Sequence, residues 1–311
     1  MTAIRGRYAP SPTGDLHRGN LRTALLAWLA ARKLEGTFIL RIEDLDLPRT
    51  RPGATERIID DLRWLGLAWD EGPDCGGPYG PYHQSSRQAI YEAALADLRA
   101  ANLLYPCYCT RAELARAIAS PGNAPDEPRY PGTCHHLTEK QRRAYEESGR
   151  RPAWRFHVPE GVVRFADGVA GPQAQDVARA VGDFIVRRSD GIIAYQLAVV
   201  VDDGLMSITQ VVRGADLLDS TARQIILFRA LGYSIPTYTH VPLMADAAGA
   251  KLSKRERAEG LGPARAAGIA PEVVVGQLAA SAGIWPAGTP ISPRELLDID
   301  RENDVMPLKP L

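Results

Sequence analysis

Apolar and polar residues recur with two periods along the chain, one typical of helices and one typical of buried strands. After residue 20, apolar residues return every three to four positions, which predicts a helix with one buried face. That face consists of Leu21, Ala24, Leu25, Trp28 and Leu29. Residues 37–42 form a short apolar run, as expected for a strand buried on both faces of a parallel sheet. Further helices are predicted at 54–65 and 86–102. Alternating strands and helices favour a doubly wound α/β fold.

The pattern changes at residue 105 and returns to strand–helix alternation near residue 182. Between these points lie two capping boxes, each predicted to start a helix, and two alternating segments typical of antiparallel strands at 154–158 and 162–166. We therefore predict a nucleotide-binding catalytic domain in two halves with an insertion between them and a short helical region at the end. The predicted boundaries are 1–104 and 182–255 for the two halves, 105–181 for the insertion and 256–311 for the helical region.

The second half has a predicted hairpin, formed by residues 184–187 and 192–201, in which the second segment continues as a buried strand that ends at Asp202 and Asp203. Two further strands are predicted at 208–212 and 238–244, with a helix between them at 219–231. Two short helical segments are predicted at 271–282 and 293–299.

Composition is that of an ordinary globular protein, with 45% hydrophobic and 24% charged residues among 311. Lys+Arg and Asp+Glu both total 37, so the formal net charge is zero and a general nucleic-acid coat is excluded. Basic residues gather locally in 140–164, which is either a solvated face or a nucleic-acid contact. Neither a signal peptide nor an apolar run long enough for a bilayer is present, so we expect a cytoplasmic protein without membrane contact.

Residues 7–20 contain two prolines and two glycines directly before the first predicted helix. They therefore predict a strand, a turn-rich loop and a helix N-terminus. Unpaired N–H groups and the positive end of the helix dipole favour an anion there, and His17 could contact a phosphate. Far along the chain, Lys251 and Lys254 supply cations. We expect both stretches to close on one nucleoside triphosphate.

Four motifs occur in order and resemble the class I glutamyl-tRNA synthetases: Ser11-Pro12-Thr13-Gly14 with His17 and Gly19, Arg41-Ile42-Glu43-Asp44, Val212-Arg213-Gly214, and Lys251-Leu252-Ser253-Lys254-Arg255. The resemblance implies a Rossmann-like catalytic domain. Few residues follow the lysine motif, and this length, with the cysteine spacing, is similar to the glutamyl-queuosine tRNA(Asp) synthetase family, which has this catalytic core without an anticodon-binding domain.

That resemblance implies an ATP-dependent, tRNA-independent activation of L-glutamate to glutamyl-adenylate. The glutamyl group is then transferred to the queuosine base at the wobble position of tRNA(Asp), so the anticodon stem-loop is the expected partner of a monomeric enzyme. ATP, with Mg²⁺, is expected to contact His17, Gly19, Asn20, Lys251 and Lys254. His17 and Lys254 are the expected catalytic residues: His17 would hold phosphates, and Lys254 would neutralise the charge that grows on the β- and γ-phosphates as pyrophosphate leaves.

Glutamate requires cations for two carboxylates and an anion for its ammonium group, and Arg7, Arg213 and Glu43 supply that set. By the resemblance, Arg7 with Tyr195 holds one end and Arg213 holds the other carboxylate. Glu43 and Ser11 hold the ammonium group. Glutamine is then refused because its amide would lose the charge pairing with Arg7.

Three of the four cysteines lie close together in the sequence, which favours a metal site over a secreted disulfide framework. Cys107, Cys109 and Cys134 provide three thiolates, and a structural zinc site requires a fourth ligand. The chemistry of the side chains favours His135 or His136 for that position. The resemblance implies Tyr130 instead, and one structural Zn²⁺ per chain.

Two motifs depart from the usual family pattern: His17-Arg18-Gly19-Asn20 has Asn20 in place of a second histidine or a glycine, and the lysine motif ends in Arg255. The first histidine, the glycine and both lysines are kept. Alternative functions are a truncated glutamyl-tRNA synthetase acting on the acceptor end of tRNA(Glu), a small-molecule adenylate-forming ligase, and a non-enzymatic tRNA-binding module. Arg213 could also simply form an ion pair with Asp216.

Overall fold

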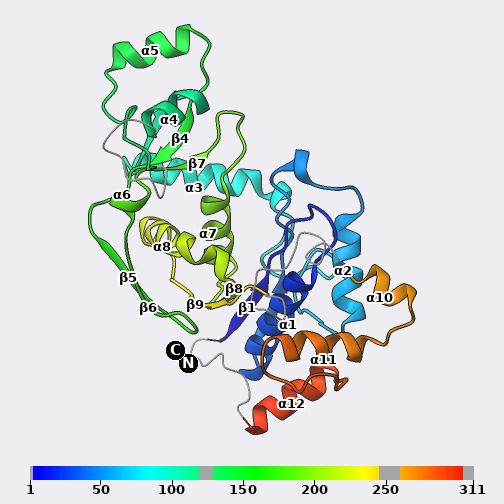
Figure 1. The fold of residues 1–311 in the computed structure, drawn as a ribbon. Helices are drawn as coiled ribbons and strands as arrows, with labels where there is room; N and C mark the ends of the chain where they lie inside the picture. Colours follow the sequence, from blue (N-terminus) through cyan, green and yellow to red (C-terminus); the bar gives the residue numbers. More distant parts are fainter. Residues whose placement is uncertain (1–2, 119–128, 245–259, 304–311) are drawn as a thin grey trace.

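The computed structural model describes residues 3–118, 129–244 and 260–303. Its largest sheet has six strands in the order β2-β1-β8-β9-β5-β6. Neighbours from β2 through β5 are parallel, and β6 is antiparallel to β5. The strands are β1 (Arg5–Tyr8), β2 (Thr37–Leu40), β5 (Val162–Asp167), β6 (Gly171–Asp176), β8 (Gln210–Gly214) and β9 (Thr237–Val241). The predicted α/β fold with a largely parallel sheet is confirmed (Figure 1).

Side chains of the central strands alternate between two apolar cores, one on each face of the sheet. On β2, Phe38 and Leu40 belong to one core and Ile39 to the other, and on β8 Val212 and Val211 divide in the same way. The first core includes residues of α1 (Arg18–Lys33), α2 (Ala54–Trp64), α10 (Gly262–Ala266), α11 (Pro271–Ser281) and α12 (Pro293–Asn303). The second includes residues of α3 (Gln88–Ala100), α7 (Tyr195–Leu205) and α8 (Thr221–Ala230). Burial on both faces is what the apolar run at 37–42 predicts.

A smaller antiparallel sheet has the order β3-β4-β7. It consists of β3 (Leu104–Cys107), β4 (Ala153–Phe156) and β7 (Phe184–Arg187), near α4 (Arg111–Ile118) and α5 (Glu139–Glu147) at the top of Figure 1. The short helices are α6 (Val177–Ala180) and the 3-10 turns η1 (Leu47–Arg49), η2 (Gln84–Arg87) and η3 (Ala215–Ser220). β5 and β6 fall inside the predicted insertion and yet extend the large sheet; the division into domains stays a prediction.

The prediction for residues 192–201 is wrong. These residues were expected to form a buried strand, but the chain forms helix α7 from Tyr195 to Leu205. Five consecutive residues of α7, from Leu197 to Val201, are buried, because the helix lies between the sheet and neighbouring helices α3 and α8. A continuous apolar run has no period, so it is the same for a buried strand and a helix buried on most sides. Asp202 and Asp203 consequently lie in the last turns of a helix.

The other predicted helices occur within a few residues of their expected bounds, and α10 was not predicted. Helix α1 packs between the sheet and the C-terminal helices α11 and α12, which fixes the position of its N-terminus at the edge of β1 (Figure 1). Among the helices in the described part of the chain, none combines the length and apolarity needed to cross a bilayer.

Candidate active site

A cavity of about 810 Å³ opens at the carboxyl ends of the parallel strands. This is the edge at which open α/β sheets bind their ligands. Eight residues predicted to contact glutamate or ATP line it: Arg7, Ser11, His17, Gly19, Asn20, Glu43, Tyr195 and Arg213. The other two, Lys251 and Lys254, lie outside the described residues. The structure thus brings all the described members of the predicted set together, and their individual roles stay predictions.

The N-terminus of α1 forms one wall of the cavity. His17 is its N-cap and forms a capping box with Asn20. The backbone N–H of Asn20 donates to Nδ1 of the His17 ring at 3.2 Å, and the backbone N–H of His17 donates to the side-chain Oδ1 of Asn20 at 3.4 Å. Because Nδ1 accepts a hydrogen bond, the neutral ring carries its proton on Nε2 and can donate it. A Cβ on Gly19 would lie 3.1 Å from this ring, so glycine leaves room for it. Arg18 instead donates to Gln277 of α11.

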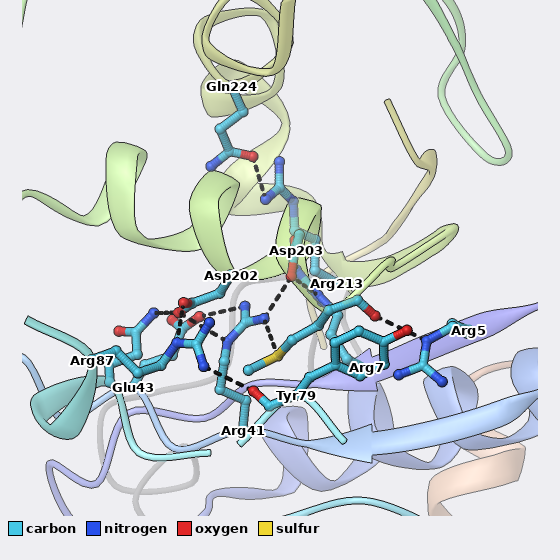
Figure 2. A network of polar contacts seen from close by, with 12 residues as sticks. Arg5, Arg7, Arg41, Glu43, Tyr79, Arg87, Asp202, Asp203, Arg213 and Gln224 are labelled. Carbon is cyan, nitrogen blue, oxygen red and sulfur yellow. Dashed lines mark hydrogen bonds and ion pairs between the residues drawn. The ribbon is translucent and has the colours of Figure 1, made fainter. Parts of the chain in front are cut away.

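A buried cluster of charges forms the floor, where α7 meets β1 and the end of β2 (Figure 2). The Arg41 guanidinium donates to Asp203 at 2.7 Å and to Glu43 at 3.1 Å. Arg7 approaches the same Asp203 with Nε and Nη2 at 3.4 and 3.5 Å. Burial alone would raise the pKa of Asp203, but Arg7 and Arg41 outweigh it and keep that pKa low. Asp203 therefore stays ionised and orients both arginines.

Glu43 and Tyr195 have the opposite pKa shift. Burial raises the pKa of Glu43, and the charges of Arg41 and Arg7 oppose this only in part. Burial, and next the charge of Glu43, raises the pKa of Tyr195, so its phenol remains a donor. The cavity thus presents cations, an acid and a hydroxyl donor to a small ligand with both signs of charge.

Arg213 lies at the end of β8 and is 4% exposed. Its guanidinium donates to His240 Nε2 (2.9 Å), Gln224 Oε1 (2.8 Å) and Thr221 Oγ1 (3.0 Å). Among the described residues it forms no ion pair with Asp216, so that alternative is wrong. Arg213 lines the cavity, and among the described residues the hydrogen-bond acceptors of its guanidinium are all neutral groups.

The three thiols expected to bind metal lie together at the end of β3, whose last residue is Cys107. Their sulfur atoms are all within 4.8 Å of one another. The Tyr130 hydroxyl lies 3.5 Å from the Cys107 sulfur and 4.0 Å from the Cys109 sulfur. His135 instead stacks on the ring of His157, with 4.2 Å between centroids. A possible three-cysteine metal site is therefore present, and the phenol of Tyr130 faces it.

Three arginines of the local basic cluster at 140–164 have partners within the fold. Arg143 pairs with Glu139 and Arg150 with Glu113. Arg155 is buried, with its guanidinium 3.6 Å from the centre of the Tyr130 ring. Arg150 and Arg155 are therefore used within the fold, whereas Arg143 is 69% exposed, and the nucleic-acid contact stays a prediction.

Comparison with known proteins decides the family. The sequence model of the family "tRNA synthetases class I (E and Q), catalytic domain" matches residues 3–281. The chain belongs to this family. Class I synthetases use ATP, an amino acid and tRNA, so this chain is a ligase of the aminoacyl-tRNA synthetase type.

Individual relatives of this synthetase chain carry two names. A glutamyl-Q tRNA(Asp) synthetase of Symbiobacterium thermophilum is 55% identical, over 94% of the chain and 91% of its own length. Glutamate–tRNA ligase 2 of Syntrophus aciditrophicus is 48% identical, but the chain spans only 57% of it. The crystal structure of a glutamate–tRNA synthetase from Elizabethkingia anophelis superposes with a TM-score of 0.83 at 31% identity, covering 95% of the chain and 65% of that structure's chain.

Several cavity residues of the synthetase were not singled out from the sequence. Arg22 of α1 donates to the backbone carbonyl groups of Pro242 and Ser281, and both Arg22 and Arg49 line the cavity. The available signal for Arg22 was one arginine among the apolar residues that follow His17. Behind the cavity lining, His240 and Asp167 gave no such signal, because their partners come from strands distant in the sequence.

Proposed function

We propose that this chain activates L-glutamate with ATP, without tRNA, and transfers the glutamyl group to the queuosine base at the wobble position of the tRNA(Asp) anticodon. The observation that carries the first step is the cavity itself, where Arg7, Arg213 and Glu43 lie beside the N-terminus of α1. The relatives named glutamyl-Q tRNA(Asp) synthetase support the second step. They match over nearly their whole length, at 55% and 49% identity.

Arg7 and Arg213 offer different hydrogen-bonding groups to glutamate. Arg7 turns its Nε–Nη2 edge to Asp203, and among the described residues Nη1 makes no hydrogen bond, so its outer end can bind both oxygens of a carboxylate. Arg213 uses Nε, Nη2 and one N–H of Nη1 within the protein, which leaves a single N–H for a ligand. Arg7 with Tyr195 therefore suits the side-chain carboxylate, and Arg213 the other carboxylate.

The ammonium group of glutamate is assigned to Glu43 and Ser11, on the same cavity. ATP is assigned to His17, the backbone at Gly19, Asn20 and the lysine motif. An oxygen of the α-carboxylate of glutamate attacks the α-phosphorus of ATP. The bond from this phosphorus to the oxygen of the β-phosphate breaks, and pyrophosphate leaves with the negative charge. Such a step requires positioning and charge stabilisation rather than a side-chain nucleophile. Mg²⁺ bound to ATP would supply further positive charge.

Exchange of labelled pyrophosphate into ATP tests the activation step. We expect exchange with L-glutamate in the absence of any tRNA, because every group assigned to the first step belongs to this chain. L-Glutamine should give less than about 1% of that rate, since a site built for a charged group strongly rejects the neutral analogue. Exchange that requires tRNA, or equal rates with both amino acids, would contradict the proposal.

One structural Zn²⁺ is proposed at Cys107, Cys109, Cys134 and Tyr130. The donor set fits, because three thiols and a phenol converge and the backbone N–H of Cys134 donates to the Tyr130 oxygen at 2.9 Å. The guanidinium of Arg155 over the ring also favours an anionic phenolate. The metal would fix the ends of β3 and the loop around Cys134.

Metal analysis and melting curves test this site. We expect about one zinc per chain after purification without chelator, and loss of zinc with a lowered melting temperature in Cys134→Ser. Tyr130→Phe should weaken zinc retention against a chelator. His135→Ala is the matched control and should retain zinc as the unchanged protein does. Substoichiometric zinc, or equal retention in both variants, would contradict the assignment.

We propose that the partner of this chain is the anticodon stem-loop of tRNA(Asp) and that the enzyme acts as a monomer. Glutamate–tRNA ligase 2 of Syntrophus aciditrophicus and that of Alkalilimnicola ehrlichii are 48% and 47% identical, but the chain spans only 57% and 58% of their lengths. The acceptor end of tRNA(Glu) is therefore the second candidate for the glutamylated site. The tRNA fragment that carries the transferred glutamate distinguishes this candidate from the anticodon stem-loop.

A further inference from the structure

We propose that Asp167 and His240 are positioning residues that aim Arg213 at a carboxylate of glutamate without neutralising its charge. The proposal rests on the proposed function, in which Arg213 binds that carboxylate. Neither residue lines the cavity, so their action is through Arg213.

The three residues come from three adjacent strands of the large sheet. Arg213 of β8 is in register with His240 of β9, and Asp167 is the last residue of β5 on the other side of β9. His240 Nδ1 lies 2.6 Å from Asp167 Oδ2, and His240 Nε2 lies 2.9 Å from Arg213 Nε. Both the His240 and Asp167 side chains are 0% exposed. They form a continuous buried chain of hydrogen bonds that ends at the cavity.

The hydrogen bonds determine the tautomer of His240. Arg213 Nε can only donate, so His240 Nε2 must carry a lone pair. The ring proton is then on Nδ1 and is donated to the Asp167 carboxylate. Burial alone would raise the pKa of Asp167, but hydrogen bonds outweigh burial and lower that pKa. Asp167 accepts from the backbone N–H groups of Val169, Ala170 and His240 and from the His240 ring, so this carboxylate is ionised. Burial, and next the charge of Arg213, lowers the pKa of His240, so the ring is neutral.

The neutral ring separates the charges of Asp167 and Arg213. The direct acceptors of the Arg213 guanidinium are His240, Gln224, Thr221 and the Leu217 carbonyl, all uncharged. These acceptors fix the plane of the guanidinium. Because none of them is an acid, the positive charge of Arg213 remains available to a carboxylate of the substrate. An acid in direct contact would instead have left a neutral pair, which attracts a carboxylate weakly.

Asp167→Asn changes this arrangement with little change in shape. Asp167 Oδ1 accepts from the N–H groups of Val169 and Ala170, so the oxygen of the amide must remain there and the NH₂ group replaces Oδ2. That NH₂ group faces His240 Nδ1 and forces the ring proton onto Nε2. Nε2–H then opposes the N–H of Arg213, and the guanidinium must turn. The same loss of the correct tautomer is known to disable the Asp–His pair of serine proteases.

The test combines histidine NMR with pyrophosphate exchange on the full chain. In the unchanged protein, ¹⁵N spectra should show His240 protonated on Nδ1, and in Asp167→Asn on Nε2. We expect KM for glutamate to rise about 10- to 100-fold in Asp167→Asn, the effect of one hydrogen bond to a charged group, with KM for ATP unchanged. A merely structural defect would lower the active fraction and leave the glutamate KM unaltered.

His240→Gln provides the second variant, because its carbonyl can still accept from Arg213 but no longer depends on a tautomer. In that background, Asp167→Asn should change the glutamate KM less than about 3-fold, so the two losses should not add. The matched control is Asp183→Asn, another carboxylate that accepts from a backbone N–H and a hydroxyl, outside the cavity, with an unchanged glutamate KM expected.

An unaltered glutamate KM in Asp167→Asn, or additive losses in the double variant, would overturn this proposal alone. Absence of glutamate-dependent exchange in the unchanged protein would overturn the proposed function and this proposal together.

Discussion

Arg7→Gln is expected to lower kcat/KM for glutamate in pyrophosphate exchange by about 100- to 1,000-fold, the range for loss of one buried charged partner. It should also lower the ratio of the exchange rate with glutamate to the rate with glutamine, because the neutral glutamine side chain at position 7 no longer distinguishes a carboxylate from an amide. Exchange kinetics with both amino acids measure both effects. The protein should still fold, since Arg41 remains 2.7 Å from Asp203 and keeps that acid paired.

Arg5→Gln is the matched control for Arg7. Arg5 lies two residues earlier on β1, pairs with Glu71 and donates to the Met206 carbonyl, and does not line the cavity. Its loss should reduce stability without changing the ratio of glutamate to glutamine rates. An unchanged ratio in Arg7→Gln itself would contradict the assignment of Arg7 to the side-chain carboxylate.

Arg41→Met is expected to lower the free energy of unfolding by about 3–5 kcal/mol, as does removal of one partner from a buried ion pair. Arg41 is 0% exposed and lies against the carboxylates of Asp203, Asp202 and Glu43. Without it, Arg7 and Arg87 are the cations left to pair with the two aspartates in the described part of the chain. Denaturant unfolding measures the loss, and a change under about 1 kcal/mol would contradict this account of the cluster.

The loss in Arg41→Met should depend on pH. In the unchanged protein the pKa of Asp203 is lowered, so this group adds stability above its unfolded pKa, and that stability is lost as pH falls through the folded value. Without Arg41, burial is opposed by Arg7 alone among these two arginines, so the folded pKa of Asp203 rises and less of this stability is gained as the pH increases. The deficit should therefore grow between about pH 4 and pH 7. Arg143→Met, at an arginine 69% exposed, is the control and should change stability by under about 0.5 kcal/mol at any pH.

Much of the fold and the candidate site could be predicted because both depend on local patterns. Strand–helix alternation predicted a parallel sheet, and the resemblance implied that Arg7, Glu43 and Arg213 share one ligand. The carboxyl ends of parallel strands share one edge, and these residues line the cavity there. Helix α7 could not be predicted, because its run of buried aliphatic residues has no period. Nor could the chain from Asp167 to Arg213, since it depends on the strand order β8-β9-β5, which does not follow the order in the sequence.

The position of labelled glutamate on tRNA tests the central claim most directly. The protein is incubated with ATP, labelled L-glutamate and bulk tRNA from cells that make queuosine, and the tRNA is then cut into defined fragments. We expect the label on the anticodon stem-loop of tRNA(Asp), and none when the tRNA comes from cells without queuosine. Label on the 3′-terminal adenosine of tRNA(Glu) would contradict the account.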